Sequence, residues 1–183
     1  MPSRFQIRAA AKAIKNQGVI AYPTESVFGL GCLPLSESAV NKILKLKRRP
    51  VEKGVILIAS NLEQLDYFTI LSKDDKSRIT RQKSPTTWLV NKSESTPEWI
   101  SGKHNKVAVR ITSHPIAKAL CDEVGGAIVS TSANPSTLKA AATILQVRQY
   151  FPTQLDYYLP GKTGIIKSAT PIIDMETNTT IRA

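Results

Sequence analysis

The stretch Lys42–Lys53 reads KILKLKRRPVEK, and the apolar run Gly54-Val-Ile-Leu-Ile-Ala59 follows it. Its twelve residues include six cations and one acid. Val40, Ile43 and Leu44 recur at helical spacing, and Lys47 is next in the same stripe. Pro50 disfavours a helical Arg49, so the helix is expected to end there. The stretch therefore predicts a cationic turn between an amphipathic helix and a buried strand.

Such a turn has a functional interpretation and a structural one. In open α/β sheets, the junctions between helices and strands border the ligand crevice. Cations that leave a helix at this point predict a site for phosphate or nucleic acid. The alternative is a solvated helix face that only keeps the protein soluble.

Composition narrows the class of protein. The 183 residues fit one domain, taken as residues 1–183, and no apolar run approaches the roughly eighteen residues of a membrane span. A net charge of +11 and a pI near 9.8 favour a polyanionic partner or substrate. Cys32 and Cys121 are expected to be reduced thiols of a cytoplasmic protein.

Helical and strand patterns interleave along the whole chain. Their mixed order and the strand-rich tail predict one α/β domain with a twisted, open, mixed sheet and flanking helices. The expected helices span 4–16, 37–49, 61–67, 72–81, 114–124 and 143–150, with one helical turn after Thr96-Pro97, and the expected strands span 18–22, 54–59, 86–90, 106–111, 127–131, 156–159, 171–174 and 179–182; residues 23–31 are expected to form a loop.

Several familiar sites are absent from the sequence. Gly161-Lys162-Thr163 resembles the end of a P-loop, but Asp156 stands where the first glycine belongs. Gly29-x-Gly31 is not followed by the third glycine of the dinucleotide fingerprint. His104 and His114 have no ligand neighbours at metal-binding spacing, so no dedicated metal site is expected.

Three other segments place hydroxyl groups or a cation at strand ends. Ser130-Thr-Ser-Ala-Asn134 offers hydroxyl, amide and backbone N–H donors for phosphate or carboxylate oxygens, or it is a turn that caps its strand. Pro23-Thr24-Glu25 offers a hydroxyl, or it is a plain turn. Arg110 ends an alternating strand and either faces a ligand or is a surface charge.

Together these segments resemble the YrdC-like threonylcarbamoyl-AMP synthase family. The resemblance rests on four motifs in family order: PTESVFGLG at 23–31, KLKRRP at 45–50, VAVRITSHP at 107–115 and STSAN at 130–134. The chain departs from the family where a W-P-G-P-x-T segment reads Gln82-Lys-Ser-Pro-Thr-Thr87, and where Thr137 replaces a glycine.

The resemblance implies a basic concave groove in which L-threonine, bicarbonate and ATP react to threonylcarbamoyl-AMP and pyrophosphate, for the t6A37 modification of tRNA. It implies Mg²⁺ carried with ATP rather than held in a protein site, and transfer of the product to threonylcarbamoyl transferase proteins. Matched to the family's motifs, the threonine-binding positions are Thr24, Arg110, Ser130 and Thr170, the ATP-binding positions are Lys47, Arg49, Lys53, Ser132, Asn134 and Arg182, and Lys47 and Arg49 are also catalytic.

The alternative hypothesis is a binding module that uses the same groove on double-stranded RNA, tRNA or a ribosome. Charge favours it, but only 6% of the residues are aromatic and the chain has no RNA-recognition signature. Pyrophosphate release that depends on ATP, bicarbonate and threonine would distinguish the enzyme from this module.

Overall fold

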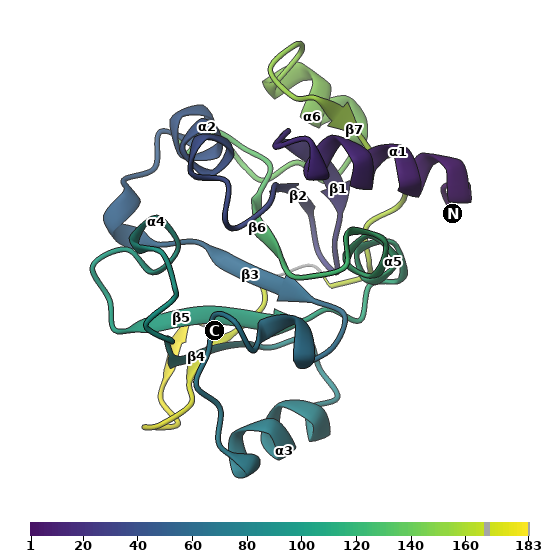
Figure 1. Cartoon of the computed structure of the whole chain (residues 1–183). Coiled ribbons are helices and arrows are strands. Elements are labelled where there is room, and N and C mark those ends of the chain that lie inside the picture. The colour runs from purple at the N-terminus through teal and green to yellow at the C-terminus, as the bar shows by residue number, and fades with distance from the viewer. Residues whose placement is uncertain (167–168, 183) are drawn as a thin grey trace.

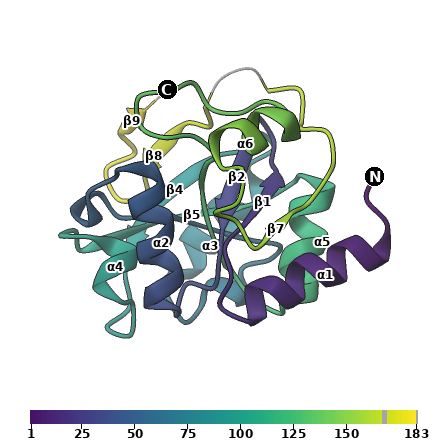
Figure 2. The ribbon, with the colours of Figure 1, turned by 90° about the horizontal axis from the view of Figure 1, so that it is seen from above.

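Short strands build a mixed sheet in the computed structural model, which describes residues 1–166 and 169–182. Within these residues the sheet has nine strands in the order β7-β1-β2-β6-β3-β5-β4-β8-β9 (Figures 1 and 2). Three neighbouring pairs are parallel, β1 with β7, β3 with β5 and β4 with β8, and the others are antiparallel. The strands are β1 Ile20–Pro23, β2 Phe28–Gly31, β3 Ile56–Ala59, β4 Thr87–Asn91, β5 Lys106–Ile111, β6 Ile128–Ser132, β7 Tyr157–Tyr158, β8 Ile172–Asp174 and β9 Thr180–Arg182.

Helices flank the sheet in two groups. Figures 1 and 2 show α1 beside α5 on one side of the molecule and α2 near α4 on the other. The single α/β domain with an open mixed sheet is the fold that the sequence predicts. The helices are α1 Arg4–Lys15, α2 Glu37–Lys47, α3 Lys73–Arg81, α4 Glu98–Ser101, α5 Pro115–Val124 and α6 Ile144–Tyr150, with short 3₁₀ turns η1 Val51–Lys53 and η2 Glu63–Leu65.

Alternation along the strands divides the core between the two faces of the sheet. Leu57 of β3 and Val129 of β6 pack in the cluster that includes Ile43 of α2. Ile58, which follows Leu57, and Ile128, which precedes Val129, pack in the other cluster, formed with α1 and α5. Neighbouring residues of β3 and β6 are thus buried against different helices.

The face covered by α1 and α5 continues beyond them. Register places on this face the residues Gly29, Ser130, Ser132, Ile56, Ala108, Arg110, Thr87, Leu89, Ile172 and Arg182. Ile56, Ala108 and Leu89 are only half-buried there, although they are apolar and lie on central strands. We call this uncovered part the open face. It presents polar and cationic side chains from strands on both sides of β3.

One expected boundary and two expected element types were wrong. The basic helix ends at Lys47 rather than near Pro50, because Arg48 adopts a left-handed conformation with φ 51°. Residues 28–31 form a strand, β2, and not a loop; its glycines hid the β pattern. The expected helix at 61–67 is also wrong, since only the 3₁₀ turn η2 forms there.

Local signals at other helix starts are confirmed. Ser3 with Gln6 and Ser72 with Asp75 each form the predicted capping box. Among the described residues, no helix combines the length and apolar character needed to cross a membrane.

Candidate active site

Lys47 joins the basic helix to the hydroxyl-rich loop after β6. Its ammonium donates to the backbone oxygens of Ser132 and Asn134 at 2.5 and 2.9 Å, and it lies 3.3 Å from Ser132 Oγ and 3.2 Å from Asn134 Oδ1. The residue is only 4% exposed. Lys47 lies in the apolar stripe of α2, as its spacing predicted, and its charge is therefore buried against oxygens of the loop.

Arg49 holds the cationic turn itself together. Its Nε and one terminal nitrogen donate to Gly54 O at 3.2 and 2.9 Å, and that terminal nitrogen also donates to Lys53 O at 3.3 Å. The Lys53 side chain is exposed. Gly54 has φ 58°, so the turn into β3 requires the left-handed region that glycine favours.

Arg110 lies buried on the open face, which overturns its interpretation as a surface charge. It is 6% exposed and donates from NH1 to Thr170 Oγ1 at 2.8 Å. Arg182 of β9 donates to the backbone oxygen of the same Thr170 at 2.8 Å. Thr87 Oγ1 lies 3.3 Å from the Thr170 hydroxyl. Two arginines from different strands thus meet at one threonine of the tail.

Neighbouring cations lower the pKa values of three basic residues at this site. Burial, and then the charge of Arg49, lowers the pKa of Lys47 to about 8. Burial and the charge of Arg182 lower the pKa of Arg49, and burial and the charge of Arg110 lower the pKa of Arg182. Each of these three shifts comes in part from a neighbouring cation, as expected where cations gather to bind an anion.

Thr24 and Ser130 meet beside a glycine. A methyl group placed on Gly29 would lie 3.3 Å from Thr24 Cγ2, 3.4 Å from Tyr22 Cζ and 3.5 Å from Ser130 Oγ. Thr24 also donates to Val27 O at 2.7 Å, which closes the turn between β1 and β2. The two predicted hydroxyl positions, 106 residues apart, therefore border the same small space.

Glu25 is a site residue that the sequence analysis did not select. It is 4% exposed, and its Oε2 lies 3.4 Å from a terminal nitrogen of Arg110. Burial opposes ionisation, but Arg110 and hydrogen bonds from Thr112 and Ser113 outweigh it and lower the pKa of Glu25. The sequence feature that could have pointed to Glu25 is its position beside Thr24 at the end of a strand. A buried acid at such a position needs a cation as its partner.

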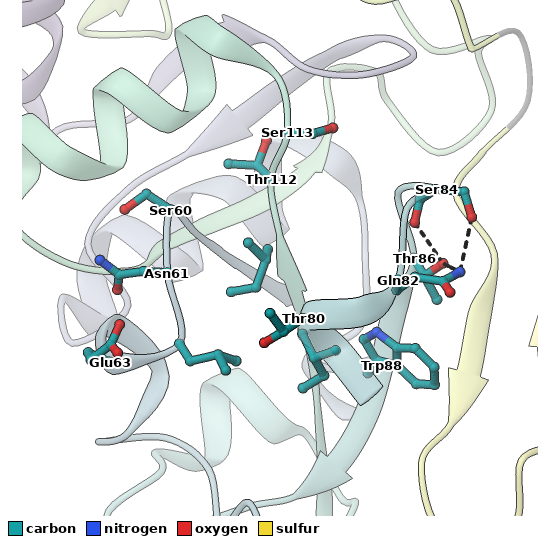
Figure 3. Close-up of a pocket in the computed structure, with 13 residues that line it drawn as sticks. Ser60, Asn61, Glu63, Thr80, Gln82, Ser84, Thr86, Trp88, Thr112 and Ser113 are labelled. Carbon is teal, nitrogen blue, oxygen red and sulfur yellow. Dashed lines mark hydrogen bonds between the residues drawn. The ribbon is translucent and has the colours of Figure 1, made fainter. Parts of the chain in front are cut away.

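A separate cavity lies outside this cluster of cations. It has a volume of about 380 Å³ and lies where the parallel strands β3 and β5 end, between Ser60 and Thr112, with Trp88 as an apolar wall (Figure 3). Gln82 donates to Ser84 Oγ and Thr86 Oγ1 at its rim, so the segment that departs from the family lines this cavity. No lysine or arginine is among its lining residues, so it has no charge with which to neutralise a triphosphate.

The cysteines and the potential metal ligands of the described residues form no further site. Cys32 and Cys121 are both free and buried, and burial raises the pKa of each thiol. Within residues 1–166 and 169–182, no three His, Cys, Asp or Glu side chains cluster as metal ligands would.

Known proteins match this chain over nearly all of its length. The family model of the Sua5, YciO and YrdC proteins, described as "Telomere recombination", matches residues 12–183. The threonylcarbamoyl-AMP synthase of Pseudomonas aeruginosa (strain UCBPP-PA14) is 46% identical over 185 aligned residues, which cover 100% of this chain and 99% of that protein.

Solved structures agree. The crystal structure of P. abyssi Sua5 complexed with L-threonine has a TM-score of 0.88 and 30% identity; the match covers 94% of this chain and 51% of that one, so this chain corresponds to about half of that protein. The crystal structure of E. coli YciO has a TM-score of 0.86 at 23% identity, over 100% of this chain and 90% of that one, which supports the fold alone. The four motifs, the sheet and these matches lead to one conclusion: the chain belongs to the Sua5/YciO/YrdC family.

Proposed function

We propose that this protein is an L-threonylcarbamoyladenylate synthase, which forms threonylcarbamoyl-AMP and pyrophosphate from L-threonine, bicarbonate and ATP. The observation that carries the proposal is the meeting of Arg110 and Arg182 at Thr170 on the open sheet face, with Arg49 near Arg182. The name of relatives that share 46% of the sequence supports the same reaction.

One end of the open face suits the amino acid. Arg110 offers a buried guanidinium for the threonine carboxylate, and Thr170 orients it. Thr24 and Ser130 both lie beside Gly29 at this end of the open face, and we assign them to recognition of the threonine side chain. The L-threonine named for the Sua5 structure supports this assignment.

The other end suits the nucleotide. Arg49 and Arg182 supply charge for the phosphates, and Ser132 and Asn134 supply hydroxyl and amide groups. Lys47 acts from beneath this loop, since its ammonium is already bonded to loop oxygens. Lys53 is exposed at the rim and contributes long-range positive charge. We assign the catalytic roles to Lys47 and Arg49.

The chemistry asks for charge stabilisation more than for a protein nucleophile. The threonine amine and bicarbonate give a carbamate and water; a carbamate oxygen then attacks the α-phosphorus, and the bond to pyrophosphate breaks. Negative charge grows on the phosphate oxygens, so preorganised cations that need no rearrangement lower the barrier. Mg²⁺ enters as part of the ATP substrate, held by phosphate oxygens and water.

A three-substrate assay tests the proposal. The purified protein is incubated with Mg·ATP, bicarbonate and threonine, and pyrophosphate is measured together with the adenylate. We expect pyrophosphate release that needs all three substrates. Release that is unchanged without threonine, or no release at all, would refute the proposed reaction.

The net charge of +11 supports a second role, binding of tRNA or double-stranded RNA by the same basic surface. Lys45, Arg48 and Arg49 border a further hollow of about 250 Å³ beside α2. Binding that weakens steeply with salt and survives without ATP supports this role. We further propose that the labile product passes to threonylcarbamoyl transferase proteins and that the protein works in the cytoplasm, where buried free thiols stay reduced.

A further inference from the structure

Glu25 and Arg110 form a buried ion pair between the β1–β2 turn and β5. Their side chains are 5% and 7% exposed, and Glu25 Oε2 lies 3.4 Å from Arg110 NH2. A charge buried this deeply is costly unless a partner holds it in place. The pair therefore determines where the guanidinium of Arg110 lies on the open face.

The carboxylate of Glu25 is fixed from its other oxygen. Oε1 accepts a hydrogen bond from Thr112 Oγ1 at 2.6 Å and one from Ser113 N at 3.1 Å. Thr112 in turn accepts from the backbone N–H of His114 at 3.2 Å. Hydrogen bonds to charged groups are the strong ones, so the Glu25 carboxylate has little freedom to rotate.

The backbone of Glu25 is clamped as well. Its carbonyl accepts from Ile166 N at 3.3 Å, and the carbonyl of Thr24 accepts from Gly164 N at 2.9 Å. A methyl group on Gly164 would lie 2.4 Å from Glu25 O, so only glycine allows the tail to approach this closely. The tail is thus hydrogen-bonded to the backbone of this turn, and Glu25 Oε2 itself is buried.

Arg110 has a defined orientation as a result. Glu25 lies at one terminal nitrogen and Thr170 Oγ1 accepts from the other. Within the described residues, Glu25 Oε2 and Arg110 Nε are buried and make no hydrogen bond. The ion pair, rather than a full set of hydrogen bonds, holds this side of the guanidinium.

We propose that Glu25 is a positioning residue, which acts through Arg110 to place the guanidinium for the carboxylate of the amino-acid substrate. This inference rests on the proposed function, because it takes Arg110 as the threonine anchor. Glu25 does not touch the substrate. It determines affinity for threonine and leaves affinity for ATP to the cations at the other end of the open face.

The test is the steady-state kinetics of Glu25→Gln, which keeps the shape of the side chain and removes its charge. We expect the KM for threonine to rise by about 10-fold to 100-fold, as for loss of an interaction with a charged group, with the KM for ATP within about threefold of wild type. Asp156→Asn is the control, because Asp156 also pairs with a cation, Lys42, and accepts a hydrogen bond from a backbone N–H, but at the β7 edge. It should leave both KM values unchanged.

Two results would overturn the inference: a wild-type KM for threonine in Glu25→Gln, or an equal rise of both KM values. If Glu25→Gln does not fold, Glu25→Asp takes its place, since it withdraws the carboxylate from Arg110 by one methylene and keeps the charge. The KM for threonine must again rise while the KM for ATP stays near that of the wild type. The wild-type assay separates the two proposals. If the wild type turns over and the Glu25 variant keeps the wild-type KM for threonine, only the positioning role is refuted. If the wild type does not turn over, the proposed function is refuted and the positioning role with it.

Discussion

Arg110 donates a hydrogen bond to the hydroxyl of Thr170 at 2.8 Å, although 60 residues separate them in the chain. The bond joins a central strand to the tail that precedes β8, and the backbone oxygen of Thr170 also accepts from Arg182. Thr170 thus holds the arginine proposed for threonine next to an arginine proposed for ATP. The two substrates would meet at this point.

Thr170→Val should raise the KM for threonine by about tenfold, because valine keeps the buried shape and loses the acceptor of a charged donor. Steady-state kinetics check this. Thr69→Val is the control, since Thr69 is equally buried and its hydroxyl donates to Leu65 O at 3.0 Å away from the site. It should cost about 1 kcal/mol of folding stability and leave the KM unchanged. An equal change of KM in both variants would contradict the prediction.

Arg49→Ala should lower product formation at least about tenfold while the circular dichroism spectrum stays that of the wild type. The side chain supplies charge at the phosphate end and also holds the carbonyls of Lys53 and Gly54. Arg48→Ala, one residue earlier and exposed, is the matched control and should retain most of the activity. Near wild-type synthesis by Arg49→Ala would count against the catalytic assignment.

ATP and pyrophosphate should stabilise the protein against heat. Arg182 is repelled by Arg110 and in turn repels Arg49, so a bound anion relieves unfavourable charge. Ligand at about 100 times its Kd adds about 2.7 kcal/mol to the unfolding free energy. For a chain of this size that is a rise in Tm of about 5–10 °C. Differential scanning calorimetry measures it. Arg182→Ala should lose much of the ATP-dependent rise; a rise as large as in wild type would exclude Arg182 from the nucleotide site.

Lys47 should lose its proton close to pH 8, because burial and then Arg49 lower its pKa from 10.5 to about 8. Activity that depends on this ammonium falls as pH rises through 8. Folding stability has the opposite sign: between about pH 8 and 10.5 the unfolded chain binds more protons than the folded one, so this residue makes stability rise with pH there. An NMR titration of ¹³C-labelled lysine, with Lys47→Met for assignment, checks the value. A midpoint above pH 10 would contradict it.

Gly29→Ala should raise the KM for threonine several-fold with little loss of stability. The added methyl group meets Thr24 at 3.3 Å and the Ser130 hydroxyl at 3.5 Å, so small shifts accommodate it but change the space between them. Gly126→Ala is the control, because nothing lies within 4 Å of a methyl group there. The two variants are compared by kinetics and thermal melting. An unchanged KM in Gly29→Ala would remove this space from the threonine site.

The predictable part of the fold is the part that local sequence patterns determine. The periods of α2 and β5 and the capping boxes at Ser3 and Ser72 depend on neighbours in sequence, and the structure has these elements within one or two residues of prediction. β2 was missed because Gly29 and Gly31 weaken any β pattern, and only packing against Tyr22 and Ser130 explains them. The end of α2 depends on a left-handed Arg48, which no propensity predicts.

The candidate site was less accessible to sequence reasoning than the fold. Hydroxyls at strand ends and the cationic turn were visible, but their grouping came only from the family resemblance. Chemistry and spacing do not show that Arg110 is buried, since its alternating strand fits a solvated face equally well. Glu25 was passed over because a buried acid becomes visible only through its partner, and that partner is 85 residues away.

The open face collects its cations from α2, near the beginning of the chain, and from β9, the last strand in chain order. A partly synthesised chain has Lys47 and Arg49 long before it has Arg182, and Thr170 reaches Arg110 only when the tail has paired with β4. The proposed nucleotide site is therefore assembled from segments that lie far apart in the chain, and it needs the docked tail. We therefore expect affinity for ATP to depend on docking of the tail, because Arg182 and Thr170 both belong to it.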